Sequence, residues 1–261
     1  MTDLPLESPD PHLHPMIRLS LVLCFGLLGC TPPASTSTPA PASSGAAAAA
    51  LPNEIKWTRA SAEHRALFLQ VYHAAESALE RQAAGLQRGS WAVVLDADET
   101  VIDNSIYQQE RAQLHAGYTA ESWTAWVKRR EATALPGAVA FLRKVHEAGG
   151  RVVIVTNRGE DVCTETRENI RRVALEADLV LCAPAGQSDK NIRFRAIEAG
   201  TASPSVPALR VAMYVGDNIQ DFPNLSQNVR LGSDSAFAEF GRRYFLLPNP
   251  MYGSWERNPI P

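Results

Sequence analysis

From Trp91 onward, short apolar runs alternate with longer segments of helix-like composition. Apolar runs without regular polar alternation are typical of strands that are buried on both faces. The strand-like runs are 91–95, 151–156, 179–182, 210–215 and 244–247, and the helix-like segments between them are 137–148, 160–177 and 190–199. This alternation predicts an α/β fold in which a parallel sheet is flanked by helices.

Two segments fall outside this rhythm. Residues 58–86 contain no proline, and their apolar positions recur at helical spacing, so we expect one long amphipathic helix there. Residues 107–134 are rich in aromatic side chains and mostly helical in composition. Because they follow the first strand, we expect them to form a small cap over the carboxyl edge of the sheet, where open α/β folds bind ligands.

Acidic residues follow two of the predicted strands. Asp96 and Asp98 follow the first one, in the stretch DADET, and Asp217 and Asp221 follow the run at 210–215, in GDNIQD. The carboxyl ends of parallel strands meet at one edge, so these carboxylates should converge. Buried carboxylates need partners, whereas a divalent cation neutralises them and one carboxylate can act as a nucleophile.

Further polar groups are expected at the same edge. Thr156, Asn157 and Arg158 end the run at 151–156, and Lys190 begins a predicted helix. Together with the acids they predict a site for Mg²⁺ and phosphate. Simpler roles stay open: Arg158, like Asp103, could brace loops through hydrogen bonds, and Asp221 could be an acid at a helix N-terminus. Arg193 and Lys128 are alternatives to Lys190 as the site's cation.

The N-terminal fifth of the chain differs from the rest. Nine of the 18 prolines precede Asn53, and residues 31–50 are uncharged and consist of Pro, Ala, Ser, Thr and Gly. Such a stretch buries too little apolar surface to offset its ordering entropy, so we interpret it as a tether. The folded domain is expected over residues 53–261.

A short apolar run precedes the tether and ends in the quartet LLGC, whose cysteine is Cys30. The run has the length of a signal-peptide core, and the quartet resembles a bacterial lipobox. We therefore predict a lipoprotein signal peptide over residues 1–29, lipidation of Cys30, and a tether over 30–52. The first fifteen residues lack the basic segment of a signal peptide, so Met16 is a candidate start. With Thr31 after the cysteine, sorting by analogy favours the outer membrane of a bacterial envelope, facing the periplasm.

The charge balance limits the partners. The formal net charge is −3, which gives no electrostatic reason to expect nucleic acid. No apolar run approaches the roughly 18–20 residues that span a bilayer, which argues against a polytopic membrane protein.

The four polar motifs resemble, in order, those of the haloacid dehalogenase (HAD) superfamily of phosphatases. The stretches DNS at 103–105, TNR at 156–158 and LPNPMYGSWE at 247–256 look like the "DDDD" acid phosphatases and the lipoprotein e(P4) 5′-nucleotidase branch, HAD subfamily IIIB. WTAW at 123–126 and PGA at 136–138 also fit this branch. The resemblance covers about residues 55–257, and it implies a Rossmann-like HAD fold with a small, mostly helical cap.

The resemblance also implies roles. Asp96 would attack phosphorus and form an aspartyl-phosphate, while Asp98 would act as general acid and base. Mg²⁺ would be held by Asp96, the backbone carbonyl of Asp98 and Asp217, with Asp221 holding a metal-bound water. The phosphoryl oxygens would contact Thr156 and nearby amides, and Lys190 would offset negative charge.

The substrate is less specified. Aromatic side chains stack on nucleobases or a nicotinamide ring, and the candidates are Tyr107, Trp123, Trp126, Tyr252 and Trp255. The resemblance implies nucleoside 5′-monophosphates, nicotinamide mononucleotide or aryl phosphates; these rings could equally pack the cap. Alternatives are a broad acid phosphatase or phosphotransferase and a non-catalytic surface lipoprotein on a HAD scaffold. Phosphatases of this type often dimerise, so a homodimer is a candidate assembly.

Cys163 and Cys182 remain after processing, and an oxidising envelope permits them to pair or to stay free.

Overall fold

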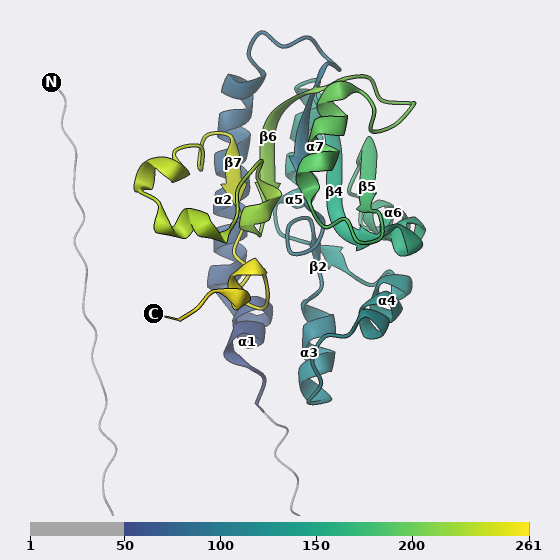
Figure 1. The fold of residues 1–261 in the computed structure, drawn as a ribbon, viewed down its shortest axis with the longest axis vertical. Coiled ribbons are helices and arrows are strands. Elements are labelled where there is room, and N and C mark those ends of the chain that lie inside the picture. The colour runs from purple at the N-terminus through teal and green to yellow at the C-terminus, as the bar shows by residue number, and fades with distance from the viewer. Residues whose placement is uncertain (1–49, 261) are drawn as a thin grey trace, which may run out of the picture. The chain divides into compact units, whose positions relative to one another are not determined.

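A computed structural model describes residues 50–260 of the 261-residue chain (Figure 1). The predicted signal peptide, the alternative start at Met16, Cys30 and all but the last three residues of the predicted tether lie outside the described residues. In the described part, no helix has the length and apolar character needed to cross a membrane.

The centre of the fold is a five-stranded parallel sheet with the order β5-β4-β1-β6-β7. Its strands are β1 (Trp91–Leu95), β4 (Arg151–Gly159), β5 (Leu179–Ala183), β6 (Arg210–Gly216) and β7 (Tyr244–Leu246). In register, Leu95 pairs with Ile154 of β4 and with Val215 of β6. The carboxyl ends of these three central strands therefore lie side by side, and the predicted fold class is confirmed.

Helices cover both faces of the sheet. In Figure 1, α7 (Lys190–Ala199) lies in front of the sheet, and α2 (Ala62–Ala83) and α5 (Ala138–Glu147) lie behind it. Phe68 of α2 and Phe141 of α5 belong to one buried cluster with α6 (Cys163–Arg172), and Phe194 of α7 belongs to a second cluster on the opposite face. The strands contribute to both clusters because successive side chains point to opposite faces.

The helix expected over 58–86 is two helices, so that prediction is wrong. Helix α1 (Asn53–Ala60) ends before Ser61, whose backbone is extended, and α2 begins at Ala62. The Ser61 hydroxyl accepts a hydrogen bond from the backbone N–H of His64 at 3.0 Å. This N-cap satisfies one of the donors left free at the start of α2.

The segment between β1 and α5 forms a small helical layer at the carboxyl edge of the sheet (Figure 1). It contains β2 (Ile102–Asp103), α3 (Ser105–Gln113), α4 (Ala120–Arg129) and β3 (Thr133–Ala134), and β2 and β3 pair as a two-stranded antiparallel sheet. The range predicted as a cap, 107–134, holds most of α3 and all of α4 and β3. Residues 96–106, which include β2 and the start of α3, separate this range from β1.

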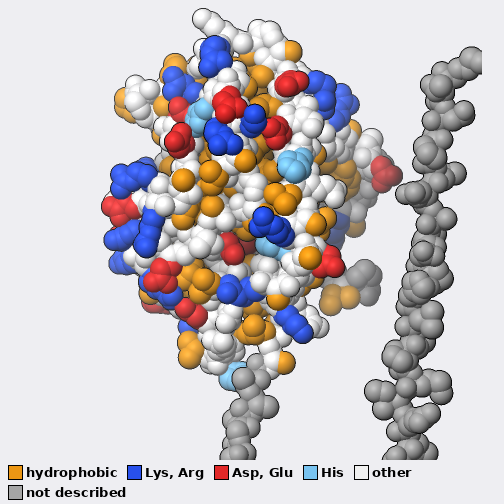
Figure 2. Space-filling view, turned by 180° about the vertical axis from the view of Figure 1, so that it is seen from behind, with side chains coloured by type: hydrophobic (Ala, Val, Ile, Leu, Met, Phe, Trp, Pro, Cys, Tyr) orange, Lys and Arg blue, Asp and Glu red, His pale blue; other side chains and the backbone are white. Residues whose placement is uncertain are grey.

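Short 3₁₀ turns connect the larger elements: η1 (Glu160–Val162), η2 (Ile219–Asp221), η3 (Gln227–Leu231), η4 (Asp234–Phe237) and η5 (Ser254–Arg257). Cys163, the first residue of α6, forms a disulfide with Cys182 of β5, with their Cα atoms 5.9 Å apart. Figure 2 shows a face of the domain on which basic and acidic side chains are interspersed.

Candidate active site

The loop after β1 is a tight turn that begins with the first predicted acid. The Asp96 N–H still bonds to the carbonyl of Val215 in β6, at 3.0 Å. Beyond it, the carbonyl of Ala97 accepts from the N–H groups of Val101 and Ile102, which folds the loop back on itself. Asp96 and Asp98 thereby both line a cleft at the carboxyl edge of the sheet.

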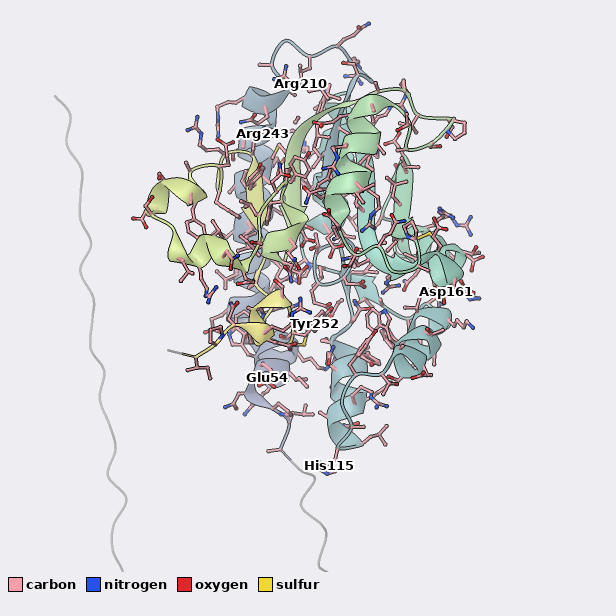
Figure 3. All side chains as sticks on the ribbon, viewed as in Figure 1. Glu54, His115, Asp161, Arg210, Arg243 and Tyr252 are labelled. Carbon is pink, nitrogen blue, oxygen red and sulfur yellow. A yellow bond between two sulfur atoms is a disulfide. The ribbon has the colours of Figure 1, made fainter. Side chains whose placement is uncertain are left out.

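This cleft has a volume of about 530 Å³ and brings together most of the predicted site residues. Those that line it are Asp96, Asp98, Trp123, Asn157, Arg158, Lys190, Asp217, Asp221 and Tyr252. They come from the ends of β1, β4 and β6, the start of α7, the helix α4 and the C-terminal segment. Figure 3 labels Tyr252 on that segment, beside the carboxyl edge of the sheet.

Lys190 links two of the acids at the base of the cleft. Its Nζ lies 2.5 Å from Oδ1 of Asp96 and 2.6 Å from Oδ1 of Asp221. Burial lowers the pKa of Lys190, but the two carboxylates outweigh this effect and the net pKa is raised above its usual value. Lys190 is therefore a fixed positive charge, held at the start of α7 by the Asp189 N-cap.

A metal-binding arrangement lies beside this lysine. Carboxylate oxygens of Asp96, Asp217 and Asp221 all lie within 4.8 Å of one another. Thr100 and Asn249 fix Asp217 by donating hydrogen bonds at 3.2 and 2.8 Å, one to each of its oxygens. Such a set of oxygen ligands suits a hard divalent cation such as Mg²⁺.

The charge of the cleft supports the same interpretation. Among the described residues that line it, five side chains are acidic and three are basic. Burial raises the pKa of Asp96 to about 7, with Lys190 opposing and Asp221 adding to the rise. Burial, then Asp221 and Asp96, raise the pKa of Asp217 well above its usual value. A divalent cation among these carboxylates removes this repulsion, so the residues present fit Mg²⁺.

Asp98 is held by a different set of residues, Arg158 and Asn104. Its Oδ1 accepts from Nη2 of Arg158 at 2.7 Å, from Nε of Arg158 at 2.9 Å and from Nδ2 of Asn104 at 2.8 Å. Its Oδ2 has one longer contact, 3.2 Å from Arg158 Nε. Arg158 thus braces a loop acid, the simpler role that the sequence left open, while it also lines the cleft.

A bulge in β4 presents the TNR stretch. Val155 pairs with Leu181 and Gly159 pairs with Ala183, so three residues of β4 lie opposite Cys182 alone. Arg193 of α7 donates hydrogen bonds to the Thr156 carbonyl and to Oδ1 of Asn157. This leaves the Asn157 side chain on the cleft wall.

Thr156 itself is placed differently from what we predicted. Its side chain is buried, and its Oγ1 accepts a hydrogen bond from the Arg158 N–H at 3.1 Å. It is absent from the cleft lining that the described residues form. In this arrangement Thr156 stabilises the bulge, and direct contact with a phosphoryl oxygen would require its hydroxyl to turn.

Three of the five aromatic candidates do not line the cleft within the described region. Tyr107 and Trp126 are each 2% exposed and belong to the hydrophobic core, and the Tyr107 hydroxyl bonds to Ser122. Trp255 is 44% exposed, outside the cleft. Tyr107 and Trp126 thus follow the alternative that the sequence left open, packing within the cap, whereas stacking of a substrate on the exposed Trp255 ring stays a prediction.

Trp123 and Tyr252 do line the cleft, together with Tyr118, which sequence reasoning did not single out. The Trp123 ring lies 6.4 Å from the Tyr118 ring, centroid to centroid. The Tyr252 hydroxyl is buried and has no hydrogen-bond partner among residues 50–260. These rings form an aromatic wall above the acids.

Sequence reasoning also missed the groups that hold the acids. Asn104 contacts Asp98 and accepts from Nε1 of Trp126 at 2.8 Å, and Asn249 holds Asp217. Asn104 lies in the stretch DNS at 103–105, and Asn249 lies in LPNPMYGSWE at 247–256, so both stood in motifs that indicated the site. Only the fold shows which carboxylate each asparagine contacts. Arg193 lies one helical turn after Lys190, on the same side of α7.

The arrangement can support phosphoryl transfer, because it places a carboxylate that could act as nucleophile beside a potential cation site, with a second carboxylate and fixed positive charge nearby. Comparisons with known proteins agree. The chain is similar to the class C acid phosphatase from Bacillus anthracis, at 28% identity and a TM-score of 0.70, over 78% of this chain and 85% of that one. The tungstate-bound structure of that phosphatase matches at 27% identity, with the same TM-score and coverage.

Residues 37–255 match the family described as HAD superfamily, subfamily IIIB (acid phosphatase). This match spans most of the chain and includes all the cleft-lining residues except Glu256 and Arg257. The chain therefore belongs to the subfamily IIIB acid phosphatases of the HAD superfamily, and it is a phosphomonoesterase.

Proposed function

We propose that this protein is a Mg²⁺-dependent phosphomonoesterase that acts through an aspartyl-phosphate on Asp96, with nucleoside 5′-monophosphates, nicotinamide mononucleotide or aryl phosphates as substrates. The observation that carries the proposal is the position of Asp96. It lies at the end of β1, lines the cleft, contacts Lys190 at 2.5 Å and shares a potential cation site with Asp217 and Asp221.

The proposed reaction has two transfers. An Asp96 carboxylate oxygen forms a bond to phosphorus while the ester P–O bond breaks, and the leaving oxygen takes that electron pair and a proton from Asp98. A water molecule then attacks the aspartyl-phosphate, Asp98 takes the proton from this water, and Asp96 is released with inorganic phosphate. Asp98 thereby returns to its starting protonation state.

The proposed cation and Lys190 stabilise the negative charge of the phosphoryl group and of Asp96. A bound Mg²⁺ supplies electrostatic stabilisation to the phosphoryl oxygens; Asp96, Asp217 and Asp221 are its proposed ligands, with the Asp98 carbonyl. Lys190 keeps a positive charge next to Asp96, which favours the ionised nucleophile. Asn157 is available for the phosphoryl group because it lies on the cleft wall at the end of β4.

Support for an aromatic leaving group comes from the wall of the cleft. Trp123, Tyr118 and Tyr252 line the same cavity as Asp96. Stacking of a base on an aromatic side chain contributes about 1–3 kcal/mol. A broad acid phosphatase would use the same acids but would depend less on these rings.

Envelope attachment belongs to the same proposal. Lipidation at Cys30 would place the domain beyond a tether of Pro, Ala, Ser and Thr residues, at the periplasmic side of the outer membrane. The test is expression of the full chain and its Cys30→Ser variant in bacteria fed a radiolabelled fatty acid. Label should enter the parent chain and be lost in the variant; label in neither chain contradicts the proposal.

The activity test uses the full chain purified in detergent. It measures hydrolysis of AMP, nicotinamide mononucleotide and p-nitrophenyl phosphate, each with excess Mg²⁺ and with excess chelator. Asp96→Asn keeps the shape of the side chain but removes the nucleophile, and Asp234→Asn, at an exposed position, is the matched control. Activity that survives chelation or Asp96→Asn contradicts the mechanism, and equal efficiency on all three esters favours the broad acid phosphatase.

A further inference from the structure

We infer that helix α4 positions the proton-transfer carboxylate Asp98, because Trp126 and Trp123 hold the two residues that clamp it. The inference rests on the proposed role of Asp98. It assigns a positioning role to Trp126, Asn104 and Arg158, none of which needs to touch the substrate.

The clamp acts on one oxygen of Asp98. Two Arg158 nitrogens and the Asn104 amide all contact Oδ1, at 2.7 to 2.9 Å. Among the described residues, Oδ2 has only the 3.2 Å contact with Arg158 Nε. Holding Oδ1 on one side fixes the rotation of the carboxylate and leaves Oδ2 as the oxygen free to carry a proton to the leaving group.

The clamp is itself fixed by the cap. Oδ1 of Asn104 accepts from Nη2 of Arg158 at 2.9 Å and from Nε1 of Trp126 at 2.8 Å. With both donors on its oxygen, the Asn104 amide must direct its NH₂ group elsewhere, and this group donates to Asp98. The Trp126 N–H therefore sets the amide orientation on which the contact with Asp98 depends.

A second residue of α4 covers the guanidinium. The Trp123 ring centroid lies 5.4 Å from Cζ of Arg158, within cation–π distance. Nη1 of Arg158 is buried without a hydrogen-bond partner in the described part of the chain. The aromatic ring partly compensates this donor and restrains the guanidinium plane.

Trp123 and Trp126 are three residues apart on α4, so one helical turn carries both contacts. Trp123 also lines the cleft. A substrate ring that packs against Trp123 therefore touches the same helix that orients Asp98. The cap therefore orients the carboxylate that transfers the proton, in addition to covering the acids.

The test varies the leaving group. The full chain with Mg²⁺ is assayed on phenyl phosphates whose leaving phenols differ in acidity, and log kcat/KM is plotted against the phenol pKa. An acidic phenol leaves without a proton, whereas a weakly acidic one needs Asp98. The variants are Trp126→Phe, which removes the indole N–H together with part of the buried ring system, and Arg158→Lys, which keeps the charge but loses the two-pronged contact.

We expect a steeper slope in both variants. General acid catalysis contributes about 10²–10⁴-fold, so a misdirected Asp98 should lower kcat/KM about 10- to 100-fold for the weakest phenol. For the most acidic phenol we expect a loss of less than about threefold on the same grounds. The matched control is Thr166→Val, which removes one buried hydroxyl hydrogen bond in α6 and should leave the slope unchanged.

Several outcomes overturn the inference. An unchanged slope in both variants, or equal losses on every ester, shows that the clamp does not act through proton transfer. A steeper slope in Thr166→Val shows that any buried defect has this effect. If thermal unfolding shows that one of the two variants is not folded, the slope of the other variant tests the inference. Wild-type chain that hydrolyses no ester overturns the proposed function, and the inference with it.

Discussion

The Nζ atom of Lys190 lies 2.5 Å from Oδ1 of Asp96, and this pair is buried at the base of the cleft. The lysine side chain is 4% exposed and that of Asp96 is 11% exposed. Water therefore screens the pair only weakly. The contact ties the start of α7 to the end of β1, and it couples the stability of the domain to the charge of the site.

Replacing Lys190 by methionine should destabilise the metal-free protein. The change leaves Asp96 and Asp221 buried without their cation, and breaking a buried pair costs about 3–5 kcal/mol. Mg²⁺ should recover much of this loss, because it neutralises the same carboxylates. Thermal and urea unfolding with chelator and with Mg²⁺ measure both effects, and kcat/KM should fall about 10²-fold or more.

Lys144→Met is the control for this change, because the Lys144 side chain is 46% exposed and pairs with Glu147 on the surface of α5. It should alter the free energy of unfolding by less than about 1 kcal/mol. An equal loss of stability in the two variants, or a loss in Lys190→Met that Mg²⁺ leaves untouched, would contradict the buried pair as the cause.

The metal-free protein should lose stability as the pH rises. The pKa of Asp96 is about 7 in the folded chain against an ordinary value of 3.8. Between these values the folded state binds more protons than the unfolded state, so the contribution of Asp96 is fully present below about pH 4 and is lost as the pH approaches 7. The raised pKa of Asp217 acts in the same direction.

The measurement is urea unfolding across this pH range with chelator. The difference in the free energy of unfolding between the parent chain and Asp96→Asn isolates the contribution of one carboxylate. This difference should change by about 1.4 kcal/mol per pH unit at most. Mg²⁺ should flatten the profile, because cation binding needs the ionised acids. Parallel profiles of the two chains in chelator would show that Asp96 does not titrate in this range.

The ring of Tyr252 should contribute to substrate binding. Tyr252→Leu removes the aromatic face and should raise KM for AMP about tenfold, in line with roughly 1–3 kcal/mol per stacked base. Inhibition by inorganic phosphate, which has no ring, should stay unchanged. Tyr252→Phe is the matched control: it keeps the face and removes a buried hydroxyl that has no hydrogen-bond partner in the described region, so stability should be unchanged or rise by up to about 1 kcal/mol.

A rise in KM in Tyr252→Phe equal to that in Tyr252→Leu would assign the effect to the hydroxyl instead of the aromatic face. Weaker inhibition by inorganic phosphate in Tyr252→Leu would mean that the substitution disturbs the phosphate site itself.

The central sheet was predictable because each of its five strands contains an apolar run, which local sequence reports directly. The convergence of Asp96 and Asp217 followed from the same reasoning, since parallel strands end at one edge. The break at Ser61 was not predicted because the residues on both sides of it have helical composition. A single serine in such a context signals an N-cap only once it is known that a new helix begins after it.

The aromatic residues show a different limit. Trp123 and Trp126 are the same residue type in one short stretch of sequence, yet Trp123 lines the cleft and Trp126 is buried. Both rings lie on the side of α4 that packs against the core, but Trp123 is only partly buried there and reaches the cleft. Only tertiary packing separates a ring that lines the cleft from a ring that holds Asn104.

The disulfide between Cys163 and Cys182 leads to a last prediction. Cys182 lies opposite the three-residue bulge of β4 that presents Asn157 and Arg158, and its partner begins the helix that follows the bulge. A closed loop of this length contributes about 3 kcal/mol of stability. The cross-link should therefore stabilise both the domain and the bulge.

Replacing both cysteines by alanine should lower the free energy of unfolding by about 2–4 kcal/mol, and it should lower kcat/KM because the bulge holds cleft residues less firmly. Reductant should have the same effects on the parent chain and none on the double variant, which separates the cross-link from the loss of two buried sulfur atoms. If the reduced parent keeps its full kcat/KM while its stability falls, then Arg193 alone holds Asn157 and the Thr156 carbonyl in place, and the disulfide serves stability alone.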